Sequence, residues 1–362
     1  MPVTLKDIAM LIGISRQAVA AALEGDGSSR VSPETRKKVL ALAKELNYIP
    51  NAAARKLRGG ESRTIGILAS LGMPHSNTVF SETCHILRSR GYNCLTMDHA
   101  SGELPVLCNQ LAACGVAGIV VMDVEHTPPK IMPLPELPIV FCRTKYGEAD
   151  VDVDKVDIGY IATRHLLQHG HKQVYYLAGF SSPSSRRQRG WKQALKDAGA
   201  GGKVIELRDM DGSADTLEAI LKKDGVTALF CSNDFLGAKA IRILRDRNWR
   251  IPEDIAVVGC DGHSFVEFTS PSLTTVIQPV HELAEKCAEL ILNRIANKEN
   301  GIVLEHVEIP ARLWIGGSCG CPERKLEHYY RLNTTGNLEK DYRLNFNSSL
   351  WDDPVSSNDI KP

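Results

Sequence analysis

Short apolar runs alternate with amphipathic stretches over most of this chain. The apolar runs are unbroken, as in parallel strands covered on both faces, and lie at 65–68, 118–122, 139–141, 174–177, 228–230 and 255–258. Helical patterns separate them, at 80–90, 159–168, 190–198, 214–222, 237–248 and 282–295. The alternation predicts an α/β core of parallel sheets with helices on both faces.

The predicted core lacks the motifs of the enzymes that are built on such sheets. No G-x-G-x-x-G follows the first apolar run, and no G-x-x-x-x-G-K-[ST] occurs. The H-E-x-x-H metal motif is missing too. We therefore expect no enzymatic activity, no catalytic residue and no cofactor.

Basic residues are concentrated at the N-terminus. The 43 Lys and Arg residues balance the 43 Asp and Glu residues over the whole chain. Up to Arg63 there are eleven basic and six acidic side chains, so this stretch carries +5 and the rest carries −5. A basic head on an acidic body points to a polyanion as the partner of the head. Charge alone leaves an ordinary solvated basic face as the alternative.

The first 24 residues show a helix-turn-helix pattern. Thr4, with an acid three residues later, marks a helix start; Gly13 ends that helix, and Ser15 is a good N-cap for a second one. A short helix, a glycine turn and a second short helix form the DNA-binding layout in which the second helix enters the major groove. Its first residues here are Arg16 and Gln17, which suit guanine and adenine.

Two further segments complete the head. Ser32 and the following proline start a third helix, which closes a three-helix core. Residues 51–58 predict one more short helix, too short to be stable alone in water. It could fold when it binds a partner, but from the residues alone we favour a plain linker helix.

The sequence shows neither a secretion signal nor a metal motif. No apolar run reaches the roughly 20 residues of a membrane span, and no signal-peptide core is visible. The ten cysteines lack zinc-site spacing; Cys319 and Cys321 are close, but two ligands without nearby partners do not make a metal site. We expect a cytoplasmic protein with reduced thiols, no metal and no membrane contact.

The chain resembles the LacI/GalR family of bacterial repressors over residues 3–321. The matching runs in the head are TLKDIA at 4–9, GIS at 13–15, RVSPETRKKV at 30–39 and LNYIPN at 46–51. Those in the core are GHK at 170–172, ND at 233–234, IPEDIAVVG at 251–259 and LTTV at 273–276. This set is far more specific than a helix-turn-helix pattern alone.

The resemblance implies how DNA is bound. It implies a helix-turn-helix domain at 1–48 and a hinge at 49–62 that becomes helical on operator DNA, with Leu57 as a wedge in the minor groove. The expected DNA-binding residues are Thr4, Ser15, Arg16, Gln17, Arg30, Ser32, Asn51, Arg55, Lys56, Leu57 and Arg58. Relatives carry hydroxyls and an arginine where this chain has Ala18, Ala20 and Ala21. Recognition should therefore depend more on Arg16, Gln17 and the hinge.

The resemblance also implies a two-lobed, periplasmic-binding-protein-like core at 63–322. Lobe 1 is expected at about 63–158 and 280–306, and lobe 2 at about 159–279 and 307–322. A small effector would bind between the lobes, at the carboxyl ends of the strands. The expected effector contacts are Ser70, Arg143, Arg187, Asn233 and Asp261. Three of them also have a structural interpretation: a surface charge for Arg187, a brace for Asn233 and a turn cap for Asp261.

Arg143 leads us to expect an anionic effector. Sugar-binding relatives often carry an acid after the third strand, where this chain carries Arg143, and arginine suits carboxylate or phosphate. Residues 208–212 also lack the aromatic that stacks on a sugar in relatives. A sugar acid or sugar phosphate would match. The alternative is an internal ion pair of Arg143 together with a conventional sugar effector.

Together these features predict a transcriptional repressor that binds a palindromic operator as a homodimer under allosteric control by a sugar-like effector. The rival is a solute-binding protein for transport, against which the head and the missing signal peptide argue. Residues 323–362 are polar, and their leucines recur every six residues, which is not a heptad. We expect this tail to be disordered, with a short β-like arm as the alternative.

Overall fold

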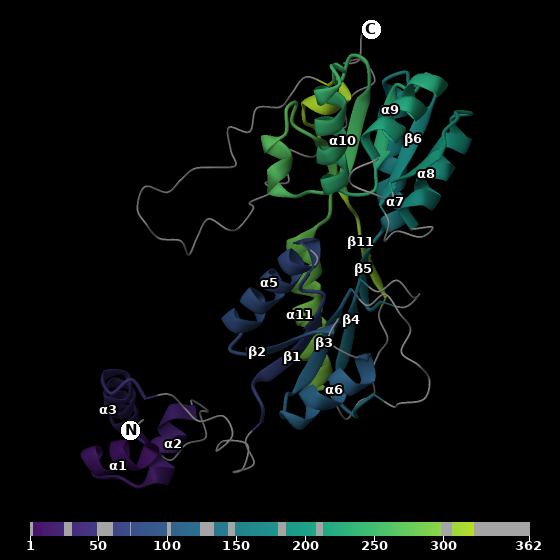
Figure 1. Cartoon of the computed structure of the whole chain (residues 1–362). Helices are drawn as coiled ribbons and strands as arrows, with labels where there is room; N and C mark the ends of the chain where they lie inside the picture. The colour runs from purple at the N-terminus through teal and green to yellow at the C-terminus, as the bar shows by residue number, and fades with distance from the viewer. Residues whose placement is uncertain are drawn as a thin grey trace.

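The computed structural model describes residues 3–24, 31–48, 61–72, 74–99, 103–123, 134–143, 149–179, 186–207, 213–297 and 306–321. Figure 1 shows a group of three helices at the N-terminal end and two α/β lobes. Several predictions fall outside the described residues: those for Arg30, Asn51, the hinge residues 55–58 and the tail 323–362.

The head is a three-helix unit made of α1 (Leu5–Ile12), α2 (Arg16–Glu24) and α3 (Pro33–Glu45). Its core is built from fully or nearly fully buried side chains of all three helices, among them Ile8, Val19 and Val39. Gly13 ends α1 with φ of 75°, a left-handed conformation that glycine adopts without a Cβ penalty. The predicted helix-turn-helix is present.

The first lobe contains a six-stranded parallel sheet. In spatial order its strands are β2 (Asn93–Asp98), β1 (Thr64–Ala69), β3 (Gly118–Met122), β4 (Ile139–Cys142), β5 (Val151–Val153) and β11 (Val307–Ile309). Helices α5 (Pro74–Ser89) and α11 (Val280–Ala296) pack against Ile65 and Ile67, while α6 (Leu104–Ala113) packs against Leu68 on the other face. Both faces of the central strands β1 and β3 are covered, so these two strands are almost wholly apolar.

The second lobe repeats the arrangement. Its strands are β7 (Val204–Leu207), β6 (Val174–Gly179), β8 (Ala228–Cys231), β9 (Ala256–Asp261), β10 (Thr274–Ile277) and β12 (Arg312–Trp314), and β12 alone among them is antiparallel to its neighbour. Helices α7 (Lys155–Gln168) and α8 (Arg186–Asp197) cover one face, and α9 (Ser213–Asp224) and α10 (Asp234–Asp246) cover the other. Two short 3₁₀ helices follow, η2 (Ser264–Phe268) and η3 (Gly317–Cys319).

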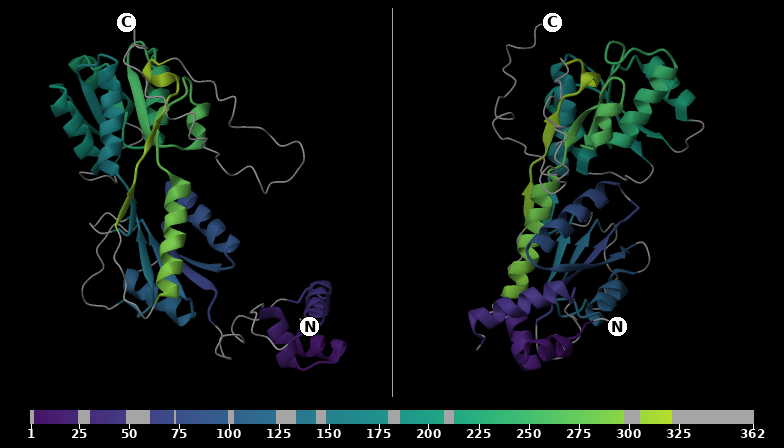
Figure 2. Two further views of the ribbon diagram at one scale, coloured as in Figure 1. Left: turned by 180° about the vertical axis from the view of Figure 1, so that it is seen from behind. Right: turned by 90° about the vertical axis from the view of Figure 1, so that its left-hand side faces the viewer.

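The chain passes between the lobes three times: from β5 to α7, from β10 to α11 and from β11 to β12. Figure 2 shows the last passage as the yellow strands that run beside green α11. Because β5 and β10 leave their sheets at their carboxyl ends, and the neighbouring strands are parallel to them, the carboxyl edges of both sheets face the crossovers. Ligands of open α/β sheets bind at that edge.

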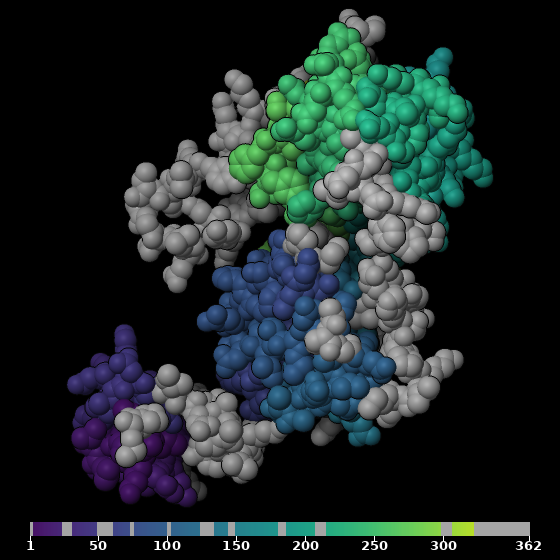
Figure 3. Space-filling model, viewed as in Figure 1, coloured from purple at the N-terminus to yellow at the C-terminus, as the bar shows by residue number. Residues whose placement is uncertain are grey.

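The predicted fold class is confirmed, with a helical head and two parallel-dominated sheets. Figure 3 shows the second lobe in green above the first in blue. β11 pairs with β5 in the first sheet, so the last crossover follows residue 309, whereas we expected the second lobe from residue 307. Among the described helices, none combines the length and the apolar character needed to cross a membrane.

Candidate nucleic-acid interface and ligand site

Thr4, Ser15 and Ser32 each cap the start of a head helix. The Thr4 hydroxyl accepts from the Asp7 backbone N–H at 3.4 Å, and the Thr4 backbone N–H donates to the Asp7 carboxylate at 2.8 Å. Ser15 Oγ accepts from the Ala18 N–H at 3.1 Å, and Ser32 Oγ accepts a backbone N–H at 3.2 Å. All three side chains are thus used in capping, and they set helix N-termini, which favour phosphate oxygens nearby.

The first turn of α2 presents Arg16 and Gln17 to solvent. Both are exposed, while Val19 and Ala22 of the same helix are buried in the head core. Arg16 also lines a surface groove beside the turn between α1 and α2, together with Lys6. This end of α2 therefore combines exposed hydrogen-bond donors with positive charge, as a base-reading surface requires.

In the second lobe, Arg187 and Asp261 form an ion pair at the carboxyl edge of the sheet. Arg187 Nη2 lies 2.9 Å from Asp261 Oδ1, and Arg187 Nη1 donates to the Ser232 carbonyl at 2.5 Å. Gln278 Nε2 donates to the same Asp261 oxygen at 2.6 Å. The Arg187 side chain is only 15% exposed, so it is not a surface charge.

Two glycines seat the start of α8 and hence Arg187. A Cβ at Gly159 of α7 would lie 1.9 Å from the Arg187 carbonyl oxygen. A Cβ at Gly190 of α8 would lie 1.8 Å from the Val156 carbonyl oxygen. The two helices therefore cross in backbone contact at this point, which only glycine permits.

Asn233 and Asp234 organise the neighbouring strand ends. Asn233 Oδ1 accepts from the Leu236 N–H at 2.8 Å and so caps α10. Asp234 Oδ2 accepts from the backbone N–H groups of Gly262 and His263 at 2.7 and 2.8 Å. Burial, followed by the nearby charge of Asp261, raises the pKa of Asp234 to about 7. We did not predict Asp234 as a site residue, although it lies next to Asn233 in the run that carried the resemblance.

Asp261 has φ of 128°, a backbone conformation that side chains other than glycine rarely adopt. The backbone N–H groups of Gly262 and His263, the two residues after Asp261, both donate to the Asp234 carboxylate. Strain of this kind is retained where the surroundings enforce it, and it is frequent at functional sites.

In the first lobe, Arg143 is paired with an acid. Arg143 Nη2 lies 3.0 Å from Asp123 Oδ1, and the Ser76 hydroxyl donates to the other Asp123 oxygen. Arg143 is 9% exposed, and both Arg143 and Asp123 have φ of 57° at the ends of β4 and β3. Ser70 follows β1 and is half-buried.

This pairing bears on the expected anionic effector. The internal ion pair that we kept as the alternative is the arrangement found, so the positive charge of Arg143 is balanced by Asp123. We did not predict Asp123 as the partner of Arg143. Its signal was an acid directly after a strongly apolar strand.

Several buried polar atoms at the two carboxyl edges have no partner among the described residues. They are Arg143 Nε and Nη1, Arg187 Nε and Gln278 Oε1. A buried donor or acceptor without a partner costs about 1–3 kcal/mol, so each position favours a polar ligand atom.

Three rings cluster at the carboxyl edge of the second sheet. The His263 and Phe265 rings stack with centroids 5.3 Å apart, and the Phe235 ring lies 4.7 Å from Phe265. Phe235 is 50% exposed and offers an aromatic face to a ligand. We had looked for such a ring at 208–212, which lies outside the described residues. The sequence signal for these rings was their position: Phe235 lies two residues after Asn233, and His263 lies two residues after Asp261.

Comparison with known proteins identifies the family. Residues 4–51 match the model "Bacterial regulatory proteins, lacI family", and residues 163–319 match "Periplasmic binding protein-like domain". The HTH-type transcriptional repressor PurR of Photobacterium profundum is 30% identical over 325 residues, which cover 82% of this chain and 93% of that protein. The chain belongs to the lacI family of bacterial regulatory proteins.

Other members of the lacI family support the same assignment. The HTH-type transcriptional regulator CelR of Thermobifida fusca is 30% identical over 319 residues, covering 82% of this chain and 92% of CelR. The lac repressor dimer bound to operator and the anti-inducer ONPF shares the fold, with a TM-score of 0.71 at 24% identity over 88% of this chain and 99% of that one. The predicted family is confirmed, and the chain is a DNA-binding transcriptional regulator rather than a transport protein.

Proposed function

We propose that this protein represses transcription by binding a palindromic operator as a homodimer, under the control of a small effector held between its lobes. The observation that carries the proposal is the exposed pair Arg16 and Gln17 at the start of α2, in a helix-turn-helix of the lacI family. Such a protein acts on chromosomal DNA, so we place it in the cytoplasm.

In the proposed complex, α2 lies in the major groove with its N-terminal end against the bases. Arg16 contacts guanine and Gln17 contacts adenine. The capped starts of α1 and α3, at Thr4 and Ser32, lie near phosphates and fix the register. The hinge 51–58, with Leu57 in the minor groove, is the part of this proposal that depends on sequence resemblance alone.

The direct test is a gel-shift assay with the full-length protein. The probe is the DNA upstream of its own gene, searched for a palindrome with a central C-G step. We expect binding that competes with unlabelled palindrome and not with a scrambled duplex. A variant without residues 1–62 should lose specific binding. Specific binding by this truncated variant would show that the head is not the DNA reader.

We predict that Arg16→Ala relaxes base preference at one position in each half-site, at a cost of about 1–3 kcal/mol in operator binding. The measurement is the Kd for operators that carry each of the four bases at every half-site position. Arg242→Ala is the control, because Arg242 is 80% exposed on the core and pairs only locally with Asp246. If both variants retained wild-type specificity, the proposed docking of α2 would be wrong.

We infer that the effector is a small polar molecule of the sugar class. The charge of Arg143 is balanced by Asp123, and the charge of Arg187 is balanced by Asp261. A site without net charge suits a neutral ligand with many hydroxyls. The unpartnered atoms of Arg143 and Arg187 are donors that hydroxyl oxygens can satisfy, and Phe235 can cover an apolar ring face. In a thermal-shift screen, neutral sugars should raise the Tm. Stabilisation by sugar acids or sugar phosphates alone would restore the anionic alternative.

Repression would then be coupled to effector binding through the crossovers. Closing the lobes moves the carboxyl edges together, and the first lobe adjoins the segment that leads to the head. The coupling free energy in such systems is about 1–3 kcal/mol. Each ligand that raises the Tm is added to the gel-shift assay. Weaker operator binding would identify an inducer, and tighter operator binding would identify a co-repressor.

A further inference from the structure

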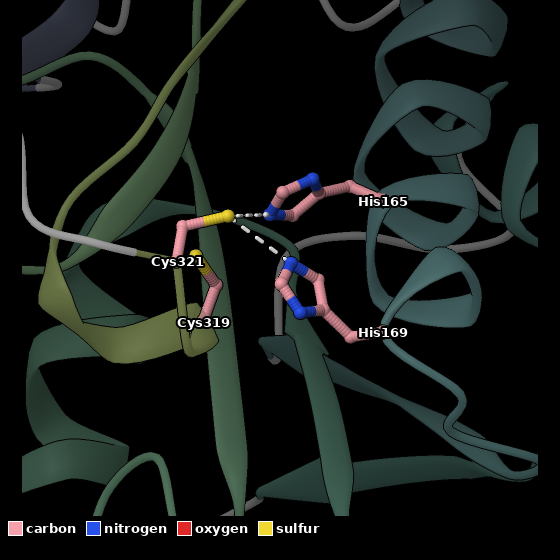
Figure 4. Close-up of side chains that lie close together, drawn as sticks. All are labelled: His165, His169, Cys319 and Cys321. Carbon is pink, nitrogen blue, oxygen red and sulfur yellow. Dashed lines mark hydrogen bonds between the residues drawn. The ribbon is translucent and has the colours of Figure 1, made fainter. Parts of the chain in front are cut away.

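Four side chains with metal-binding atoms meet in the second lobe, away from the carboxyl edge. His165 and His169 come from the end of α7, and Cys319 and Cys321 come from η3 and the residues just after it. Their ligand atoms all lie within 4.8 Å of one another. Figure 4 shows the two imidazole rings and the two thiols pointing into one space.

The fold supplies partners that the sequence spacing did not indicate. We expected Cys319 and Cys321 to lack further ligands, and this expectation is wrong. His165 and His169 are four residues apart at the end of one helix, so they share a face and point the same way. Gly320 has φ of 93°, a left-handed turn that brings both cysteines to the side of the histidines.

The distances are close to those of a tetrahedral site. His169 Nε2 lies 3.1 Å from Cys321 Sγ, and His165 Nε2 lies 3.9 Å from the same sulfur. Zinc bonds of about 2.0–2.1 Å to nitrogen and about 2.3 Å to sulfur place neighbouring ligand atoms roughly 3.3–3.8 Å apart. Small side-chain rotations would therefore bring all four atoms onto one ion.

The chemical environment agrees with this geometry. Cys319 is 1% exposed and His165 is 9% exposed, so the cluster is largely shielded from solvent. Thiolate and neutral imidazole are the forms that bind a metal.

We propose that His165, His169, Cys319 and Cys321 bind one Zn²⁺ ion in a closed, structural site. Two thiolates and two imidazoles select zinc over magnesium or calcium, which prefer oxygen ligands. Four protein ligands leave no open position, so the ion would not be catalytic. It would join the end of the core, after β12, to α7, and so fix the point from which residues 322–362 continue.

The first test measures metal in the full-length protein. The protein is purified with a phosphine reductant, loaded with Zn²⁺ and passed through a desalting column, and its zinc is counted by mass spectrometry. We expect one zinc per chain. Replacement by Co²⁺ should give the intense visible bands of a tetrahedral site and a thiolate-to-cobalt charge-transfer band in the near ultraviolet.

The second test uses matched variants. Cys321→Ser and His169→Gln should each weaken zinc binding, in competition with a chromophoric chelator, by at least about 100-fold, since loss of a group that only hydrogen-bonds to a metal ligand already costs about 10–100-fold. Cys114→Ser and His281→Gln are controls: both wild-type side chains are exposed and lie outside the cluster. The controls should bind zinc like the wild type. A chelator should lower the Tm of the wild type and leave that of Cys321→Ser unchanged.

Three results would overturn the proposal. One is wild-type protein that holds no zinc under reducing conditions. Another is a Cys319–Cys321 disulfide that persists in the reductant. The third is Cys321→Ser binding zinc as tightly as the wild type. Since Cys321→Ser could misfold, its circular dichroism spectrum is compared with that of the wild type, and the cobalt spectrum of the unmutated protein provides a test that needs no variant.

Discussion

At the scale of single residues, Asp150 and Arg294 form a buried ion pair in the first lobe. Arg294 Nη2 and Nη1 lie 2.5 and 3.0 Å from the two oxygens of Asp150, and both side chains are less than a tenth exposed. Asp150 Oδ2 also accepts from the Phe141 N–H at 2.7 Å. The pair ties α11 to the strand β4 that leads to Arg143.

We predict that Asp150→Ala lowers the free energy of unfolding by about 3–5 kcal/mol, because Arg294 is left buried without its partner. Urea denaturation followed by circular dichroism provides the measurement. Asp246→Ala, which removes an exposed pair with Arg242, should cost less than about 1 kcal/mol. If Asp150→Ala and Asp246→Ala lowered the free energy of unfolding equally, burial would not increase the cost of breaking the Asp150–Arg294 pair.

Asp234 should make stability depend on pH. Burial raises its pKa from 3.8 to about 7. Between those values the native state holds a proton that the unfolded state has released, so this residue's contribution to stability is lost as the pH rises. Asn at this position can still accept the N–H bonds from Gly262 and His263 and cannot ionise.

We therefore predict that Asp234→Asn gains stability relative to the wild type as the pH rises from about 4 to about 7, by up to about 1.4 kcal/mol per pH unit. The free energy of unfolding of both proteins is measured across this range. A constant difference between the two proteins would show that Asp234 keeps an ordinary pKa.

At the scale of helices and strands, the crossing of α7 and α8 is the tightest contact at the ligand site. We predict that Gly190→Ala destabilises the protein by an amount at the upper end of about 1–3 kcal/mol, because the added Cβ meets the Val156 carbonyl and neither backbone can yield easily. It should also displace Arg187 and reduce stabilisation by the effector. Thermal melts with and without effector measure both.

Gly72→Ala is the matched control for that prediction. A Cβ there would meet nothing within 4 Å. The substitution should leave the Tm nearly unchanged or slightly raised, since alanine restricts the unfolded chain. A Gly190→Ala protein as stable as Gly72→Ala would mean that the two helices can separate without cost.

The strands divide into those that sequence patterns reveal and those that they do not. The central strands β1, β3, β6, β8 and β9 are buried on both faces and form unbroken apolar runs. We did not predict β2, β5, β7, β10, β11 or β12. β5 and β11 are three residues long, and β2 is only partly buried. Short or edge strands leave no periodic signal, because their pairing depends on the rest of the sheet.

At the scale of the whole molecule, Arg186 joins the lobes at the crossovers. From the start of α8 it pairs with Asp152 of β5, and its Nη1 lies 3.0 Å from Glu308 of β11. Any change in lobe orientation acts on these contacts. They connect α8, which also carries Arg187, to the crossover strands.

We predict that the protein is a dimer in solution. A palindromic operator needs a two-fold protein. The leucines of residues 323–362 recur every six residues and not in the heptads of a coiled coil. Analytical ultracentrifugation of the full chain should give twice the chain mass of 39.7 kDa. A stable tetramer would show that another surface, or the tail, adds a second interface.

Local patterns were sufficient for the helical head, the parallel sheets and the family. Capping residues such as Thr4, Ser15 and Ser32 act within one helical turn, and apolar runs report burial directly, so both can be read along the chain. The partners of charged and metal-binding side chains could not be read in this way. Arg143 meets Asp123 across neighbouring strands, and Cys319 meets His165 across more than a hundred residues. Such contacts depend on where the folded backbone brings distant residues together, and no local periodicity encodes that.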